Sequence, residues 1–212
     1  MRVQQLVVAL CLLTGGWTNA QDLNLELGFG FGAATADANT KDKGELALTF
    51  LKAYERGTFG IDIAFGGTLN PYGNDGEDYF DGNEFTIDPS ENRYTFITLL
   101  YRYPIANIVY VEPRLGYSNL GFYVSTNNGR DSENISNLTL GLGIGKTLGR
   151  FTLAFRYQYM GRTANYEGTV RTFIDDDTTE ENTIRQNDVG FNLFIFRVAY
   201  GFNLGKLFRK KS

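Results

Sequence analysis

The sequence contains no histidine, and its single cysteine and single tryptophan, Cys11 and Trp17, both lie near the N-terminus. Zinc sites built from cysteine and histidine, disulfide frameworks, cysteine nucleophiles and Ser-His-Asp triads are therefore excluded. The 212 residues carry 20 Lys and Arg against 24 Asp and Glu, so the chain is not a polycation and nucleic acid is not an expected partner. After residue 20, no stretch is apolar for long enough to cross a bilayer as a helix.

Glycine and aromatic residues are abundant, whereas proline is scarce. The chain has 25 Gly, 17 Phe and 13 Tyr but only 4 Pro. Aromatic residues favour β-strands, and the composition shows no enrichment in helix formers. The composition therefore indicates an all-β fold.

The first 20 residues have the organisation of a secretory signal peptide. Arg2 supplies the positive charge, residues 6–13 form a short apolar core, and Thr18-Asn19-Ala20 forms a cleavage site of short residues. The sequence predicts a signal peptide over residues 1–20 that is cleaved after Ala20, and export of the remaining chain.

From residue 23 onwards, apolar residues alternate with polar or small ones. In the first segment the apolar positions are Leu23, Leu25, Leu27, Phe29 and Phe31. A period of two predicts a two-faced β-strand. Seven further segments have the same pattern, at about 45–50, 59–66, 93–103, 109–118, 138–145, 151–160 and 188–204.

The last of these segments is less regular than the others. Leu193 and Ile195 are apolar in one phase, whereas Phe196 and Val198 are apolar in the other. We expect a phase slip, such as a β-bulge, near residues 194–196.

The connections between the eight segments alternate between short and long. Three are tight turns, at about 55–58, 104–107 and 148–150, and four are long and polar, at about 33–44, 68–92, 119–136 and 162–187. An even number of antiparallel strands with short turns at one end and long loops at the other is typical of a bacterial outer-membrane barrel, whose termini both lie on the periplasmic side.

A soluble eight-stranded barrel of the lipocalin kind is the alternative, and the chemistry of the two strand faces argues against it. The less apolar face is rich in Gly, Ala, Thr and Ser, which suits a narrow interior better than a water-facing surface. The other face carries rows of Leu, Ile, Val and Phe, with aromatic residues near strand ends, as an interfacial girdle requires: Tyr54, Phe59, Tyr101, Tyr103, Phe151, Tyr157 and Tyr159. The sequence predicts an eight-stranded antiparallel up-and-down transmembrane β-barrel over residues 21–204, followed by a short basic periplasmic tail at 205–212.

The pattern resembles that of the small outer-membrane β-barrels of Gram-negative bacteria, a family that includes OmpX-like, OmpA-type and opacity-type barrels, and its style is similar to barrels of the Bacteroidetes group. Residues 197–202, Arg-Val-Ala-Tyr-Gly-Phe, look like the terminal-strand signal that the barrel assembly machinery reads, although this chain continues to Ser212. The resemblance implies location in the outer membrane, with membrane lipid, lipopolysaccharide and the barrel assembly machinery as partners.

Charged residues in the interior phase form a candidate charge network in the lumen: Glu26, Asp62, Arg102, Glu112, Arg114 and Arg156, joined by Glu45 and, if the last strand keeps the later phase, Arg197. Because an unpaired buried charge is costly, we expect these acids and arginines to pair and fill the barrel. A water-filled polar pathway is the alternative.

Two of the long connections are acidic. Residues 70–91 contain seven acids and no Lys or Arg, and residues 163–187 contain a further acidic run. Neither has the ligand spacing of an EF-hand, so a solvated acidic surface is expected rather than a metal site, and no cofactor is predicted. Aromatic residues within the first of them, Tyr72, Tyr79, Phe80 and Phe85, make an extracellular ligand at these loops a candidate partner.

Outer-membrane barrels that are enzymes form the last class to consider. The known families of this kind use a catalytic histidine, which this chain lacks, and no pair of carboxylates is singled out by its spacing. We therefore expect no catalytic residues. The predicted role is structural or surface-interactive, with a narrow, porin-like passive pore or an accessory part of an envelope secretion machine as alternatives.

Overall fold

The computed structural model describes residues 23–36, 39–69, 92–126, 129–163, 165–175, 178–186 and 188–204. The predicted signal peptide, the acidic segment 70–91 with its aromatic residues, and the basic tail 205–212 lie outside the described residues. Within the described ranges, no helix is long and apolar enough to cross a membrane.

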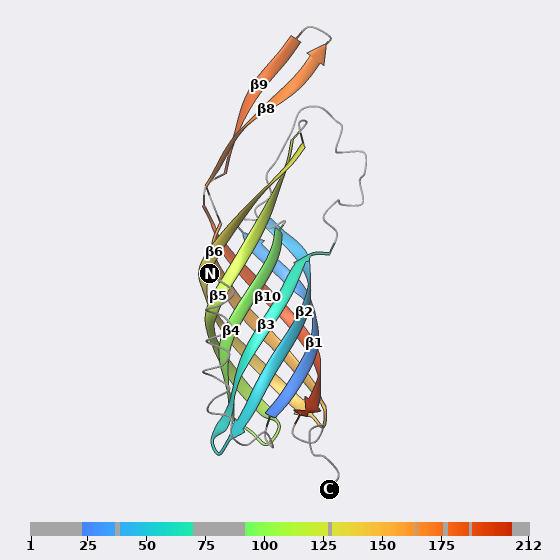
Figure 1. Ribbon diagram of the computed structural model, residues 1–212, viewed down its shortest axis with the longest axis vertical. Helices are drawn as coiled ribbons and strands as arrows, with labels where there is room; N and C mark the ends of the chain where they lie inside the picture. Colours follow the sequence, from blue (N-terminus) through green and yellow to red (C-terminus); the bar gives the residue numbers. More distant parts are fainter. Residues whose placement is uncertain are drawn as a thin grey trace.

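The eight barrel strands are arranged in chain order, with each strand antiparallel to its neighbours (Figure 1). Their bounds are β1 Leu23–Ala36, β2 Asn39–Tyr54, β3 Gly57–Thr68, β4 Asn92–Pro104, β5 Val109–Thr126, β6 Gly129–Leu148, β7 Phe151–Arg162 and β10 Gly190–Asn203. Pairing of β1 with β10, for example Leu27 with Tyr200, closes the sheet and leaves no open edge. The predicted eight-stranded antiparallel barrel is confirmed.

Alternation along each strand separates an inner from an outer face. On β6, Thr139 is fully buried, whereas Leu142 is 57% exposed. The same rows of Leu, Ile, Val and Phe that define the period in the sequence point outwards around the whole barrel, and an apolar outer wall surrounds the closed sheet.

Short turns gather at one end of the barrel, which we call the turn end (Figure 1). They join β2 to β3, β4 to β5 and β6 to β7, at the positions that the sequence predicts. Gly149 in the last of them has a φ of 63°, a left-handed conformation that glycine adopts without strain.

At the opposite, hairpin end, two predicted loops are strand instead. β1 and β2 remain paired up to Ala36 and Asn39, and β5 and β6 up to Thr126 and Gly129, so segments 33–44 and 119–136 are mostly hairpin. The prediction of long loops there was wrong, because backbone pairing continues beyond the apolar part of each strand and does not need apolar side chains.

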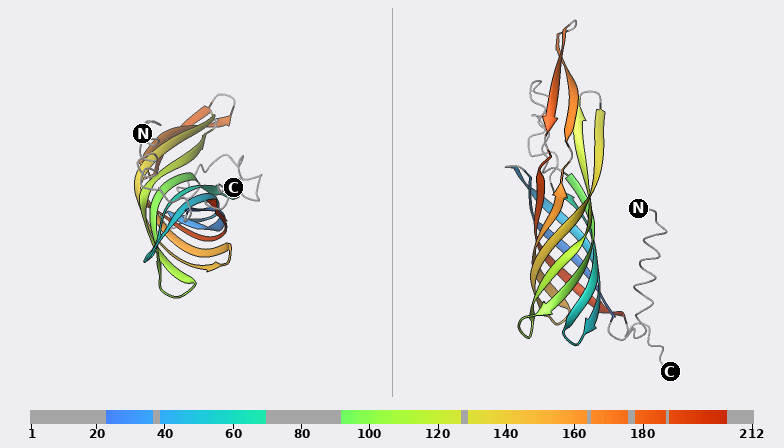
Figure 2. Two further views of the ribbon diagram at one scale, coloured as in Figure 1. Left: turned by 60° about the horizontal axis from the view of Figure 1, so that its bottom comes forward. Right: turned by 90° about the vertical axis from the view of Figure 1, so that its left-hand side faces the viewer.

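Segment 162–187, also predicted as a loop, contains a two-stranded hairpin outside the barrel (Figure 2). β8 Tyr166–Asp175 pairs with β9 Thr178–Gln186, and the hairpin projects beyond the hairpin end. The sequence analysis missed it because neither strand carries the long apolar alternation of a barrel strand.

The phase slip expected in the last strand is also wrong. β10 alternates regularly, with Leu193, Ile195 and Arg197 inside and Phe194 outside. Both phases are apolar because the upper interior is itself apolar, as described below. The one irregularity in the register of β10 with β7 lies earlier, between Gly190 and Asn192.

Candidate functional site

The interior of the barrel is filled by two groups of inward side chains. Towards the turn end lies a charged cluster made of all six residues of the candidate network and two more: Glu26, Glu45, Asp62, Arg102, Glu112, Arg114, Arg156 and Arg197. Inward alternation on seven different strands brings them together from positions as distant in the chain as 26 and 197. Four acids thus meet four arginines in one lumen.

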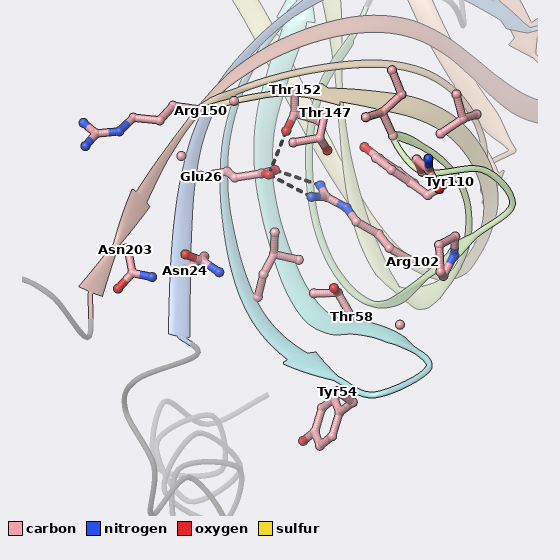
Figure 3. Close-up of a pocket in the computed structure, with 18 of the residues that line it drawn as sticks. Asn24, Glu26, Tyr54, Thr58, Arg102, Tyr110, Thr147, Arg150, Thr152 and Asn203 are labelled. Atoms are coloured by element: carbon pink, nitrogen blue, oxygen red, sulfur yellow. Dashed lines mark hydrogen bonds and ion pairs between the residues drawn. The ribbon is translucent and has the colours of Figure 1, made fainter.

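Arg102 organises the part of the charged cluster nearest the turns. Its Nη1 and Nη2 atoms donate to Oε1 and Oε2 of Glu26 at 2.7 and 2.8 Å, a bidentate pair, and its Nε donates to Oε2 of Glu112 at 2.6 Å. The Thr152 hydroxyl also donates to Glu26 Oε1, at 2.9 Å (Figure 3). Such charge-assisted, two-pronged contacts fix the guanidinium across the barrel from β1 to β5.

Asp62 is the centre of the next layer. Its Oδ1 accepts hydrogen bonds from Thr49 Oγ1 at 2.5 Å and Arg197 Nη1 at 2.6 Å. Its Oδ2 lies 2.7 Å from Arg114 Nη2 and 3.2 Å from Arg156 Nη1. One fully buried carboxylate therefore faces three arginines.

Glu45 and Glu112 balance the remaining positive charge. Arg197 Nη2 donates to Glu45 Oε1 at 2.5 Å, and Arg156 Nη2 donates to the same oxygen. Arg114 Nε lies 2.9 Å from Glu112 Oε1 and so joins the two layers into one network. The cluster as a whole is close to neutral, as pairing in a narrow lumen requires.

Hydrogen bonding in the lumen is not complete among the described residues. Several buried polar atoms have no hydrogen-bond partner there, including Glu45 Oε2, Arg114 Nη1, Arg156 Nε, Tyr94 Oη and Tyr110 Oη. Each such atom costs free energy, so the interior is held by ion pairs more than by a saturated hydrogen-bond network.

Towards the hairpin end, an apolar cluster fills the lumen. Its members are Ala34, Ala36, Ala47, Ala64, Tyr94, Phe96, Leu120, Met160, Phe191, Leu193 and Ile195. The Phe96 ring forms the border with the charged cluster, because the guanidinium carbons of Arg114 and Arg156 lie 5.9 and 5.8 Å from its centroid. Tyr94 stacks nearly parallel to Phe96, with ring centroids 6.1 Å apart.

The sequence analysis missed this apolar cluster, since it expected small and polar residues on the whole inner face. Its signal was present in the sequence as the second apolar phase of β10, which was interpreted as a slip. Lys43 was missed too: it is fully buried, donates from Nζ to Thr68 Oγ1 at 2.6 Å, and lies 5.8 Å from the Phe191 ring centroid.

A cavity of about 830 Å³ lies at the turn end (Figure 3). Glu26, Arg102, Tyr110 and Thr152 line its inner part, so the charged cluster closes it towards the hairpin end. The cavity is therefore a recess at the turn end that stops at the charged cluster, and side chains fill the barrel beyond it. Within the described ranges, no group of three or more potential ligand residues is arranged to hold a metal ion.

The base of the β8–β9 hairpin is fastened by a set of contacts that we call the clasp. Arg162 Nε donates to Asp188 Oδ2 at 2.7 Å. The Thr163 amide donates to the Val189 carbonyl, and the Val189 amide donates to the Thr163 hydroxyl, both at 2.9 Å. The Asp188 amide donates to Asn165 Oδ1 at 2.8 Å. These bonds join the two chain segments that lead into and out of the hairpin.

A bulge in β7 lies directly below the clasp. Gly161 has a φ of 93°, and a Cβ atom there would lie 2.2 Å from Asn137 Cβ, so only glycine fits. Asn137 Nδ2 donates to the Arg162 carbonyl at 2.8 Å. The bulge therefore turns β7 out of the barrel wall into the hairpin.

Fold and interior together define a closed, side-chain-filled, eight-stranded antiparallel barrel that carries an extra hairpin. No family model matches the chain, and no curated protein matches it in sequence. Among solved structures, Neisserial surface protein A has 11% sequence identity and a TM-score of 0.51, with 85% of this chain and 97% of that chain covered. A major outer membrane protein from Thermus thermophilus has 15% identity and a TM-score of 0.51, with 85% and 99% covered. The chain thus has the fold of small outer-membrane β-barrels, as predicted.

Proposed function

We propose that this protein is a non-enzymatic integral outer-membrane barrel that acts as a closed scaffold and presents its hairpins outside the cell. The observation that carries the proposal is the contrast between the two faces of the sheet. Large apolar side chains point outwards around the closed barrel, whereas charged residues are paired inside it. That inversion of a soluble protein's pattern is what a hydrocarbon environment demands.

The filled interior favours a scaffold over a passive pore. Paired arginines close the turn half of the lumen, and packed aromatic and aliphatic side chains close the other half. An eight-stranded barrel leaves an interior just wide enough for side chains. No continuous path for solutes is expected through such an interior.

The clasp supports a role in presentation. An isolated two-stranded hairpin is marginally stable in water, so a fixed base gives the β8–β9 hairpin a defined direction away from the barrel. Its sequence contains six acids, which fits interaction with a basic or cation-bridged surface: Glu167, Asp175, Asp176, Asp177, Glu180 and Glu181.

Labelling of intact cells tests the location and orientation. A single cysteine at Asn107, in a short turn, should resist a membrane-impermeant thiol reagent, whereas one at Thr169, in β8, should react. The only natural cysteine, Cys11, lies in the predicted signal peptide and gives no background once that segment is removed. Permeabilised cells provide the control, because both positions should then react. Reaction at position 107 in intact cells would reverse the orientation and refute presentation of the hairpin.

A further inference from the structure

The outer wall of the barrel has a hollow near the hairpin end. It is an apolar groove of about 560 Å³ on the outside of β1, β2, β7 and β10, lined by Phe31, Gly32, Ala33, Asp42, Leu69, Phe155, Phe194 and Phe196. Elsewhere on this wall, large apolar side chains stand next to one another, so the groove needs a local cause.

Small residues on two neighbouring strands create the groove. Ala33 on β1 is paired with Phe194 on β10 and with Asp42 on β2, so a methyl group stands between two larger side chains. Beside Phe31, β2 contributes Gly44, which has no side chain at all. Leu69 lies over that glycine: its Cδ2 atom is 2.5 Å from where a Cβ of residue 44 would be.

Aromatic rings make the walls of the groove. The Phe31 and Phe196 centroids are 5.5 Å apart with planes tilted by 58°, and Phe194 packs against Tyr157 at 5.2 Å. Tyr157 is itself held by a 2.8 Å hydrogen bond from its hydroxyl to Asn192 Oδ1. These rings thus pack in two pairs along the walls of the groove.

The groove joins the apolar wall to its polar border. Phe31 is the last large apolar residue of the outward row on β1, and the exposed Asp42 marks the polar end of the groove on β2. A molecule that fits this gradient has a flexible apolar chain and a polar, cationic end.

We propose that the groove binds one bilayer lipid, with an acyl chain between the phenylalanine rings and a primary ammonium group of the lipid's polar end beside Asp42. This inference rests on the proposed function, because it requires the wall to face a bilayer. A lipid is favoured over a second copy of the chain, since the groove is continuous with the lipid-facing rows on both sides and is shaped for a narrow chain.

Tryptophan quenching by brominated lipid tests the proposal. The only tryptophan, Trp17, lies in the predicted signal peptide, so one introduced residue reports on the exported chain. Leu69→Trp places the probe at the groove, directly after β3, and Leu115→Trp places it on the exposed outer face of β5, two strands from β3 around the barrel. In phosphatidylcholine vesicles containing brominated phosphatidylethanolamine, half-maximal quenching at the groove should need a severalfold lower fraction of brominated lipid than at position 115.

Two substitutions, one that fills the groove and one that removes its negative charge, identify which part of the lipid is bound. Ala33→Phe, added to the Leu69→Trp chain, should abolish the preference, whereas Thr95→Phe, a similar enlargement on the outer face of β4, should leave it unchanged. Asp42→Asn should remove the preference for phosphatidylethanolamine over phosphatidylglycerol and keep the binding of the acyl chain. Heat-modifiable mobility on SDS gels, the difference between unheated and heated samples, shows whether each variant has folded.

Two outcomes would overturn the proposal. Identical quenching curves at positions 69 and 115 mean that the groove holds only bulk lipid. Weaker quenching at position 69 than at 115 means that protein, such as a second copy, covers the groove. In both cases the quenching at position 115 still reports whether the barrel lies in the bilayer, so the proposed function is judged separately.

Discussion

The two halves of the lumen are filled by different kinds of interaction. Near the turns, ion pairs such as Arg102 with Glu26 fill the space, and near the hairpins, packed rings and aliphatic chains such as Phe96 and Leu120 do so. Ion pairs have a defined geometry and become costly when one partner is lost, whereas an apolar core tolerates volume-conserving changes. The charged half therefore fixes which side chains meet, and we expect the apolar half to exclude water and ions.

Removing the central carboxylate should have the largest effect on stability. Asp62→Ala leaves Arg114, Arg156 and Arg197 with too little negative charge in a buried place, and we expect the free energy of unfolding to fall by about 3–5 kcal/mol. Urea titration in lipid vesicles, followed by the mobility of the folded band on SDS gels, measures this.

The matched control is the aspartate of the clasp. Asp188 pairs with Arg162 where both side chains are largely exposed, at 41% and 60%, so water screens the pair and Asp188→Ala should have a much smaller effect. Equal losses for the two variants would mean that Asp62 is not the centre of the network.

A cavity in the apolar half should lower the free energy of unfolding by less than Asp62→Ala does, or at most by as much. Leu120 is fully buried in the apolar cluster, and Leu120→Ala should lower the free energy of unfolding by about 2–5 kcal/mol, since the space left behind is not refilled. Leu142→Ala is the control: lipid refills the space at this outward position. If both variants lose equally, the apolar cluster is not packed as described.

Conductance in planar bilayers tests which half of the lumen blocks the passage of ions, independently of stability. The unmodified protein should stay close to baseline, and so should Arg114→Ala, because the apolar cluster still blocks the lumen. Combining Arg114→Ala with Phe96→Ala removes the border between the halves, where the two side chains meet, and should admit a small ion current. A stable current from Arg114→Ala alone would mean that the charged cluster, rather than the apolar cluster, blocks the lumen. It would contradict the roles assigned to the two halves.

The charged half was predictable from the sequence and the apolar half was not. Glu112 and Arg114 are two residues apart on one strand, so a period of two places them on one face. Which charge meets which depends on the register between strands, and the pairing of Arg102 with Glu26 follows from barrel closure rather than from local sequence. Leu193 and Ile195 violated the assumption of a single apolar face and were interpreted as a slip.

The hairpin outside the barrel escaped prediction for a related reason. Periodicity detects strands that bury one face, and β8 and β9 pair only with each other. The clasp depends on the left-handed conformation of Gly161. In a glycine-rich sequence, nothing local shows which glycine adopts such a conformation.

The smallest expected effects compare two hydroxyl groups within the charged half. The Thr152 hydroxyl donates to the Glu26 carboxylate, and Thr152→Val should lower the free energy of unfolding by about 1.5–3 kcal/mol, as is typical for a hydrogen bond to a charged group. The Tyr110 hydroxyl has no hydrogen-bond partner among the described residues, while its ring lies 4.7 Å from the Arg102 guanidinium carbon. Tyr110→Phe keeps the ring and removes a buried hydroxyl that has no partner there, so it should raise the free energy of unfolding, by about 1 kcal/mol. A loss of stability, measured by the same urea titration, would show that the Tyr110 hydroxyl takes part in the network, through water or through a residue outside the described ranges.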